Sequence, residues 1–286
     1  MNHISDTIAT RQSEVWQTNT GIIDTGEGVI LVDPGILANE LDDLVASLQG
    51  RPIVAGFATH FHWDHILWTP NLGISPRYAS AETCDLIMSH AERIAKNLDG
   101  FEQYVAQEYG LGPQWDRSMF FDFRPMPLGP GTIAGVDCEL VPIPGHADGM
   151  VAVVLPEHDV AFVADTLSDI EIPSLADGEG QRDRYLETLD RLQGVIDRVS
   201  WVIPGHGAVA DRTEAQRRLD LDRRYLTDLP RLVANAPTSQ SNEDLATSIL
   251  MELNETRASS DLSAQMHLDN VRMLREQTGE LTPEDQ

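Results

Sequence analysis

Short apolar runs that end on a polar residue recur along the first 210 positions of the chain. Residues 15–34 read as short strands separated by glycine turns, and the apolar run 29–32 leads directly to Asp33. Residues 38–48 instead carry apolar side chains three and four positions apart, which predicts one helix. Residues 52–58 form another short apolar run, so the opening pattern is strand, helix, strand.

The pattern changes twice after this opening. Residues 80–109 have the mixed charge and spacing of a helical region, and the aromatic and proline-rich stretch 115–130 reads as loop. Strands are then expected at 138–143, 150–155, 160–164 and 201–203, with a hairpin connection at 156–159 and an amphipathic helix at 182–199.

No strand signal remains after Asp211. A capping-box pattern at 213–216 is expected to open a long helix, residues 237–241 read as a linker, and two more helices are expected at 242–253 and 261–277. We therefore divide the chain into a domain at 1–210, with a helical and loop insertion at 80–130 in the position of a lid, and a helical extension at 211–286.

Charge narrows the classes of partner. Asp and Glu number 46 against 20 Lys and Arg, giving a formal net charge of −26. This field repels nucleic-acid backbones and anionic membrane surfaces and favours a small-molecule substrate. Two cysteines are too few for a disulfide framework, and neither a secretion signal nor an apolar run of about 18 residues is present. A cytoplasmic protein without a membrane segment is the expectation.

The strand ends collect histidine and aspartate. Five of the nine histidines lie directly after apolar runs, and the residues at these ends are Asp33, His60, His62, Asp64, His65, His146, Asp165 and His206. A glycine precedes both His146 and His206, and we expect it to let the backbone turn sharply so that the imidazole points back across the sheet edge. Imidazole and carboxylate are the ligands that zinc and neighbouring divalent metals take. The set is large enough for two cations, with Asp165 bridging and Asp33 outside the count, accepting a hydrogen bond from a ligand histidine or bracing the loop.

The motif His-x-His-x-Asp-His at 60–65, together with Asp33 before it and His146, Asp165 and His206 after it, resembles the metallo-β-lactamase superfamily over roughly residues 15–210. The resemblance implies an α/β fold, an αββα sandwich of two mixed sheets flanked by helices, with a small C-terminal helical extension. It also implies His60, His62 and His146 on one metal ion, Asp64, His65 and His206 on a second, and Asp165 between them. Zinc is the expected metal, with manganese, iron and cobalt as alternatives.

Two close divalent cations lower the pKa of a bound water to about 7, which predicts a hydrolase that attacks with a hydroxide. Asp64 is our candidate catalytic residue, orienting the hydroxide and passing a proton to the leaving group. Trp68, Phe120 and Phe121 are candidate walls of the substrate pocket, and they favour a lactone or another neutral carboxylic ester.

Other reactions stay open because the superfamily is diverse. Thioester hydrolysis of the glyoxalase II type and β-lactam hydrolysis are disfavoured because Lys96 is the only lysine, and phosphodiester hydrolysis is disfavoured by the negative charge. Leu67, where many members have glycine, and Ala147, where a hydroxyl residue is frequent, weaken analogy with any one branch. An oxidoreductase similar to the mononuclear iron persulfide dioxygenases and a non-catalytic metal-stabilised module are the alternatives from other classes. For the C-terminal helices, a cover over the site and a homodimer interface both stay open.

Overall fold

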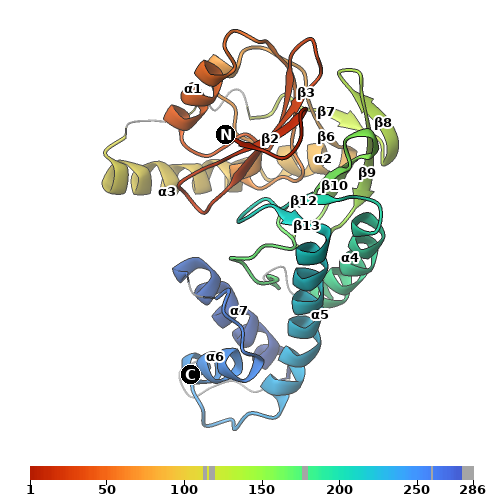
Figure 1. Ribbon diagram of the computed structural model, residues 1–286. Coiled ribbons are helices and arrows are strands. Elements are labelled where there is room, and N and C mark those ends of the chain that lie inside the picture. The colour runs from red at the N-terminus through yellow and green to blue at the C-terminus, as the bar shows by residue number, and fades with distance from the viewer. Residues whose placement is uncertain (112–114, 116–119, 176–179, 259, 279–286) are drawn as a thin grey trace.

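Two mixed β-sheets form the centre of the protein (Figure 1). The computed structural model describes residues 1–111, 115, 120–175, 180–258 and 260–278. The first sheet runs in sequence order through β1 (Asn2–His3), β2 (Ile8–Gln12), β3 (Asn19–Asp24), β4 (Val29–Val32), β5 (Ile53–Phe57), β6 (Arg77–Ser80) and β7 (Arg124–Met126). Its pairs are antiparallel as far as β4 and parallel from β4 to β7.

The second sheet has the order β13-β12-β11-β10-β9-β8. Its strands are β8 (Gly129–Ile133), β9 (Val136–Pro142), β10 (Val151–Leu155), β11 (Val160–Phe162), β12 (Trp201–Ile203) and β13 (Ala210–Asp211). Among these described strands, the β11–β12 pair is parallel and the other pairs are antiparallel. β10 and β11 are joined by the short 3-10 helix η4 (Pro156–His158), which confirms the expected hairpin.

Alternating side chains explain why β10 is apolar throughout. Val151 and Val153 face the first sheet and pack in one cluster with Phe57 of β5, whereas Ala152 and Val154 belong to the cluster on the opposite face. A strand with both faces buried needs apolar residues at every position. This strand therefore lies in the middle of a layered structure.

Helices cover both outer faces and complete the αββα sandwich. On the first sheet, α1 (Ala38–Ser47) packs through Leu41 and Leu44. On the second sheet lie α4 (Gln181–Ile196) and α5 (Arg212–Ala234), which share one apolar cluster with β10, β11 and β12. The expected fold class is confirmed.

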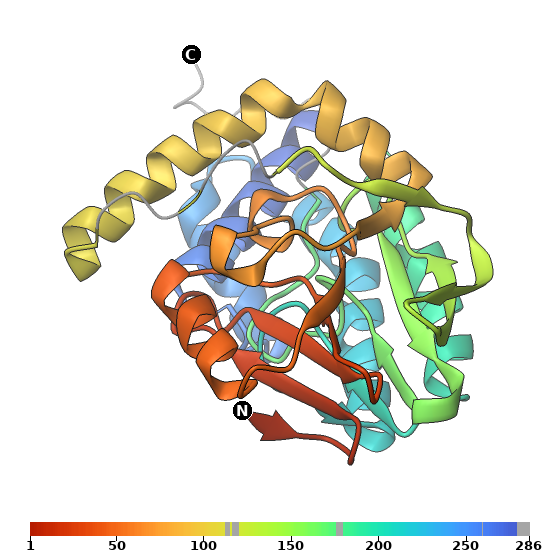
Figure 2. The same cartoon turned by 90° about the horizontal axis from the view of Figure 1, so that it is seen from above.

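The described residues of the region 80–130 contain more secondary structure than the sequence indicated. The helical part divides at His90 into α2 (Ala81–Ser89) and α3 (Ala91–Tyr109), which follow one another along one side of the molecule (Figure 2). The stretch expected as loop contributes β7, which pairs with β6, and the start of β8. These strands were missed, as were β1, β2 and β6, because they are short and carry polar residues, so that only their partners identify them.

The C-terminal helices α6 (Asn242–Leu253) and α7 (Asp261–Thr278) confirm the last two expected helices. The long helix before them begins earlier than the sequence indicated, because Asp211, not Thr213, caps α5 by accepting a hydrogen bond from the backbone N–H of Glu214 at 2.8 Å. The apolar cluster runs without a break from α4 through α5 to α6 and α7. In the part of the chain that the structure describes, no helix has the length and apolar character to cross a membrane.

Candidate metal centre

The ligand candidates lie at neighbouring strand ends. Asp33 follows β4, and residues 60–65 follow β5 in a turn that includes the short 3-10 helix η1 (Trp63–His65). His146 follows β9, Asp165 follows β11 and His206 follows β12. Strands from both sheets therefore deliver polar side chains to one place.

These side chains form two groups, and within each group the ligand atoms all lie within 4.8 Å of one another. The first group is His60, His62, His146 and Asp165, and the second is Asp64, His65 and His206. The structure thus brings together all seven residues that the sequence indicated as ligands, in the grouping that the resemblance implied.

Distances within the first group are short. His146 Nε2 lies 3.1 Å from His62 Nδ1, and it lies 3.4 Å from Asp165 Oδ2. His60 Nε2 also lies 3.4 Å from Asp165 Oδ2. Three imidazole nitrogens and one carboxylate oxygen therefore point at a common centre.

Asp165 also reaches the second group. Its Oδ1 lies 3.2 Å from His65 Nε2, and its Oδ2 lies 3.6 Å from His206 Nε2. Asp64 Oδ2 lies 3.4 Å from each of the same two nitrogens. Asp165 stands between the groups, which is the position a bridging carboxylate requires.

Burial controls the charge state of the first group. The pKa of His62 falls to about 3 and that of His146 to about 4, in each case chiefly because burial disfavours the charged imidazolium. Burial and the nearby His65 also lower the pKa of His60. These three imidazoles are therefore neutral at pH 7 and have lone pairs available for a cation.

In the second group, the nearby carboxylates together shift the pKa of His65 more than burial does. Burial alone would lower the pKa of His65, but the negative charges of Asp165, Asp64 and Asp33 raise it well above its ordinary value. Burial would raise the pKa of Asp64, but His65 and His206 hold it well below the usual range. A negative field that retains a proton among buried groups also attracts a metal cation.

Two buried polar atoms test whether a cation fits. His60 Nε2 and Asp165 Oδ1 make no hydrogen bond, although both are excluded from solvent. Leaving such atoms unpartnered costs free energy, and a divalent cation at the centre would ligate both. The nitrogen and carboxylate donors fit zinc and its neighbours in the first transition series.

Hydrogen bonds behind the cluster orient three of the histidines. His65 Nδ1 donates to Asp33 Oδ2 at 3.1 Å, and His60 Nδ1 donates to Thr59 Oγ1 at 3.1 Å. His206 Nδ1 lies 3.1 Å from the carbonyl oxygen of Trp16. In each case the second nitrogen, Nε2, is left to face the centre.

The sequence did not identify Thr59 and Trp16, because a threonine and a backbone carbonyl carry no recognisable signal. The same holds for Glu171, a half-buried residue on the segment after Asp165. The pKa of Glu171 is raised to about 7, chiefly by burial; the charge of His206 opposes this rise, and the charges of Asp165 and Asp64 contribute to it.

The glycines before His146 and His206 act differently from the expectation. Neither Gly145 nor Gly205 has a positive φ, so a sharp left-handed turn is not what requires them. A β-carbon on Gly205 would collide with Asp165, and one on Gly145 would approach the ring of Tyr185 to 2.9 Å. The chain does turn at Gly145 and bend at Gly205, but it is the close packing, not a positive φ, that requires glycine at both positions.

Trp68, Phe120 and Phe121, which were expected to line the pocket, pack instead in or against the hydrophobic core. Trp68 is 1% exposed, packs against α1 and donates its indole N–H to the carbonyl oxygen of Gly73. Phe120 is fully buried in the core, and Phe121 is half-buried against the same cluster. Trp68 and Phe120 therefore pack in the core and do not line a cleft, because burying their large apolar area is more favourable than exposing it to solvent.

Two adjoining hollows open beside the centre. One, of about 270 Å³, is lined by Phe61, His62, Trp63, Asp64, Arg93, Ile94 and Asn97. The other, of about 560 Å³, is lined by Trp16, Trp63, Lys96, Asn97, Gly100, Phe101 and Tyr104. They share Trp63 and Asn97 and together form what we call the α3 cleft.

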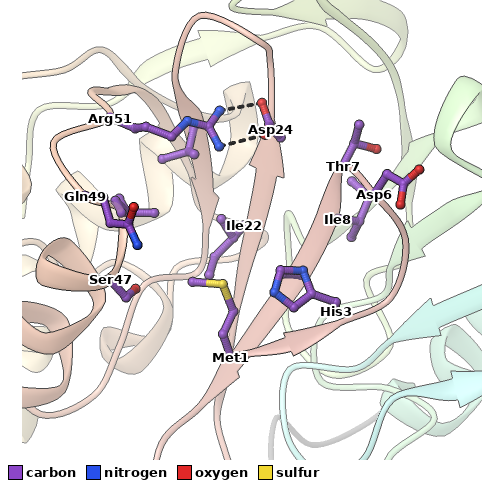
Figure 3. Close-up of a pocket in the computed structure, with 13 residues that line it drawn as sticks. Met1, His3, Asp6, Thr7, Ile8, Ile22, Asp24, Ser47, Gln49 and Arg51 are labelled. Atoms are coloured by element: carbon purple, nitrogen blue, oxygen red, sulfur yellow. Dashed lines mark hydrogen bonds and ion pairs between the residues drawn. The ribbon is translucent and has the colours of Figure 1, made fainter.

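A third hollow, of about 400 Å³, lies at the opposite end of the first sheet (Figure 3). Its lining includes Val29 at the start of β4, whereas Asp33 follows the end of that strand. Arg51 and Asp24 form an ion pair at its rim. It contains none of the seven ligand candidates and is separate from the centre.

Comparison with known proteins agrees with this geometry. Residues 13–226 match the family model described as the metallo-beta-lactamase superfamily. Among curated proteins, the chain is 24% identical over 226 residues to an atrochrysone carboxyl ACP thioesterase of Aspergillus fumigatus, a match that covers 78% of this chain and 61% of that protein.

Solved structures show the same fold. The sec-alkylsulfatase Pisa1 from Pseudomonas sp. matches with a TM-score of 0.67 at 17% identity, over 94% of this chain and 49% of that one. A metallo-beta-lactamase family protein from Thermus thermophilus matches with a TM-score of 0.58 at 19% identity, over 93% and 92% of the two chains. The chain spans about three fifths of the curated relative and about half of the sulfatase.

Proposed function

The chain belongs to the metallo-beta-lactamase superfamily, and from this membership and the geometry of the centre we propose that it is a metal-dependent hydrolase of an ester-type bond. The observation that carries the proposal is the convergence of five histidines and two aspartates on two adjoining centres. A ligand set of this kind has little use in a purely structural role, since structural zinc sites are closed four-ligand cages.

We assign His60, His62 and His146 to one divalent cation, Asp64, His65 and His206 to the other, and Asp165 to both. Such a pair of cations supplies a hydroxide nucleophile near neutral pH and Lewis acidity toward the oxygen of the scissile bond. The neutral state of His60, His62 and His146 supports this assignment, and Asp33 and Thr59 hold the ring orientations. Zinc is our first choice of metal.

Asp64 is the candidate for proton handling. Its carboxylate lies between His65 and His206, and it also lines the smaller hollow of the α3 cleft. A ligand that faces both the cations and the cleft can accept a proton from the attacking water and release it to the leaving group. His62 borders the same hollow, so the substrate approaches from the side of α3.

For the scissile bond we propose a carboxylic ester, with a lactone as the first candidate and a thioester as the second. The thioesterase relative from Aspergillus fumigatus favours the thioester, although that match covers 61% of the relative. Both bonds present a carbonyl carbon and an oxygen that gains charge during attack, so the same centre serves either.

The test is a substrate panel with metal analysis in parallel. The purified protein is assayed against lactones, aryl esters, thioesters, β-lactams and phosphodiesters, while its metal content is measured. We expect cleavage of esters or thioesters that disappears on chelation and in His62→Ala, with Asp24→Asn as the control. Vigorous activity that resists chelation would overturn the proposal, and one iron per chain with oxygen uptake would support an oxidoreductase instead.

A further inference from the structure

The α3 cleft carries two cationic side chains on one face of a helix. Arg93, Lys96, Asn97, Gly100 and Tyr104 are spaced by three, one, three and four positions along α3, so they share one side of it. Arg93 lines the hollow that contains His62 and Asp64, and Lys96 lines the larger one next to it. The positively charged side chains of Arg93 and Lys96 therefore lie along the approach to the metal centre.

Arg93 and Lys96 have no carboxylate partner within the described part of the protein. Other arginines, such as Arg51 and Arg257, form ion pairs. Among the described residues, Arg93 forms no ion pair and no hydrogen bond, and its guanidinium lies over the ring of Phe61, 5.3 Å from the centroid. Lys96 is also without a described partner, and it is the only lysine of the chain. In a protein of net charge −26, two unpaired cations beside a site are available to a ligand.

Acidic side chains do not cancel this charge within the cleft. The only carboxylate among the described residues that line the two hollows is Asp64, which we assign to a metal ion. An arginine and a lysine at the mouth match an anionic oxygen group on a substrate.

Aromatic side chains form much of the remaining lining of the cleft. Trp63 lies next to Asp64 in the chain, and its ring centroid is 4.5 Å from Phe101 and 5.6 Å from Trp16. Phe101 is 5.8 Å from Tyr104, which is 43% exposed. This row of rings starts at the metal centre and runs along α3 into the larger hollow, a surface suited to an aromatic or extended apolar group.

We propose that the α3 cleft selects a substrate that carries a carboxylate in addition to its scissile ester-type bond, with Arg93 and Lys96 binding that carboxylate and the aromatic row binding the apolar part between the two. This inference rests on the proposed function, because it assumes that the reacting bond is placed at the centre. It revises the expectation of a wholly neutral substrate, which had depended on Trp68, Phe120 and Phe121 as the walls of the pocket.

A matched pair of substrates tests the proposal. An aryl ester of a long-chain dicarboxylic acid with its second carboxylate free is compared with the same compound methylated at that carboxylate. We expect kcat/KM to favour the free acid by at least about tenfold, the factor that corresponds to 1.4 kcal/mol. Arg93→Gln and Lys96→Gln should each reduce that ratio, and the double variant should bring it close to one. Arg272→Gln, which removes an exposed arginine on α7, should keep the ratio of the unaltered protein.

A binding measurement separates this inference from the hydrolase assignment. Calorimetric titration with 4-phenylbutyrate and with its amide requires no turnover. Binding of the acid but not the amide, lost in the Arg93→Gln and Lys96→Gln double variant, supports the cleft even if no ester is cleaved. Ester cleavage without preference for the free acid, or a preference that survives in the double variant, overturns the inference and leaves the proposed function standing.

Discussion

Asp33 supports two ligand histidines at once, because it accepts from His65 Nδ1 directly and from His60 Nδ1 through Thr59. Its Oδ2 lies 3.1 Å from His65 Nδ1 and 2.7 Å from Thr59 Oγ1, and its Oδ1 accepts from the Thr59 backbone N–H at 2.8 Å. Thr59 Oγ1 in turn lies 3.1 Å from His60 Nδ1. One carboxylate thus orients one histidine of each proposed metal site.

Replacing Asp33 by Asn should weaken metal binding. An amide N–H facing His65 Nδ1 cannot accept its proton, so the imidazole is driven to the tautomer whose Nε2 carries hydrogen and cannot ligate. We expect about 10- to 100-fold lower metal affinity, measured by competition with a chelator. Asp24→Asn, which alters an exposed ion pair with Arg51, is the matched control. Unchanged affinity in Asp33→Asn would show that the orientation is set elsewhere.

Removing the metal should lower thermal stability. Without cations the buried carboxylates Asp64 and Asp165 lie among imidazoles with unpartnered atoms, and a ligand that binds only the folded state stabilises it by about 2.7 kcal/mol at 100 times its Kd. We expect chelation to lower the Tm and zinc to restore it. In His62→Ala the Tm should respond much less to chelator, and a response equal to that of the unaltered protein would contradict the assigned site.

Gly205→Ala should disturb the bridging carboxylate. A β-carbon there would overlap Asp165 and come within 2.9 Å of His65 Cε1, so Asp165 must move. We expect loss of metal from the purified variant, measured by elemental analysis, together with loss of activity. Gly194→Ala, in α4 with open space around the added methyl group, should instead leave the metal content unchanged and raise stability by about 0.5–1 kcal/mol.

Arg257 should be the most sensitive arginine of the C-terminal region. It is 5% exposed, pairs with Asp222 and Glu255, and lies 3.4 Å from the carbonyl oxygen of Ser168 in the segment after Asp165. Arg257→Ala leaves Asp222 buried without its partner, so we expect a loss of about 3–5 kcal/mol in the free energy of unfolding by urea. Arg272→Ala, which breaks an exposed pair, should cost less than about 1 kcal/mol.

Glu214 should give a stability contribution that depends on pH. Hydrogen bonds from Arg217 and Arg218, opposed by partial burial, lower its pKa from 4.5 to about 2. A depressed pKa in the folded state stabilises above the unfolded pKa, and the effect fades as pH falls from about 4.5 to about 2. Because the carboxylate is one-third exposed, we expect only about 1 kcal/mol between the unaltered protein and Glu214→Gln at pH 7. Urea unfolding at pH 7 and pH 3 should show a smaller difference at the lower pH, and a constant difference would contradict the ionic origin.

Local sequence was sufficient to select the candidate ligands as a set, and the resemblance that this set carries implied the layer order. An apolar run that ends on histidine or aspartate places a polar side chain where a strand leaves its sheet. His60, His146, Asp165 and His206 were therefore recognisable as an ordered set of candidate ligands, whereas each of them alone is a weak signal. Helices with a regular apolar stripe, such as α1 and α6, were equally clear, because the stripe alone predicts a buried face.

Tertiary structure decided everything that depends on which surfaces meet. Trp68 and Phe120 are aromatic residues of the kind that line pockets, but Trp68 is buried against α1 and Phe120 is buried in the core. Arg93 and Asn97, in contrast, border the centre only because α3 lies beside η1. The role of Gly205 is likewise invisible until Asp165 is seen against it. Residue types and their periodicity are properties of short segments, but distances between segments far apart in the chain follow from how the two sheets and α3 pack, and no single segment contains that information.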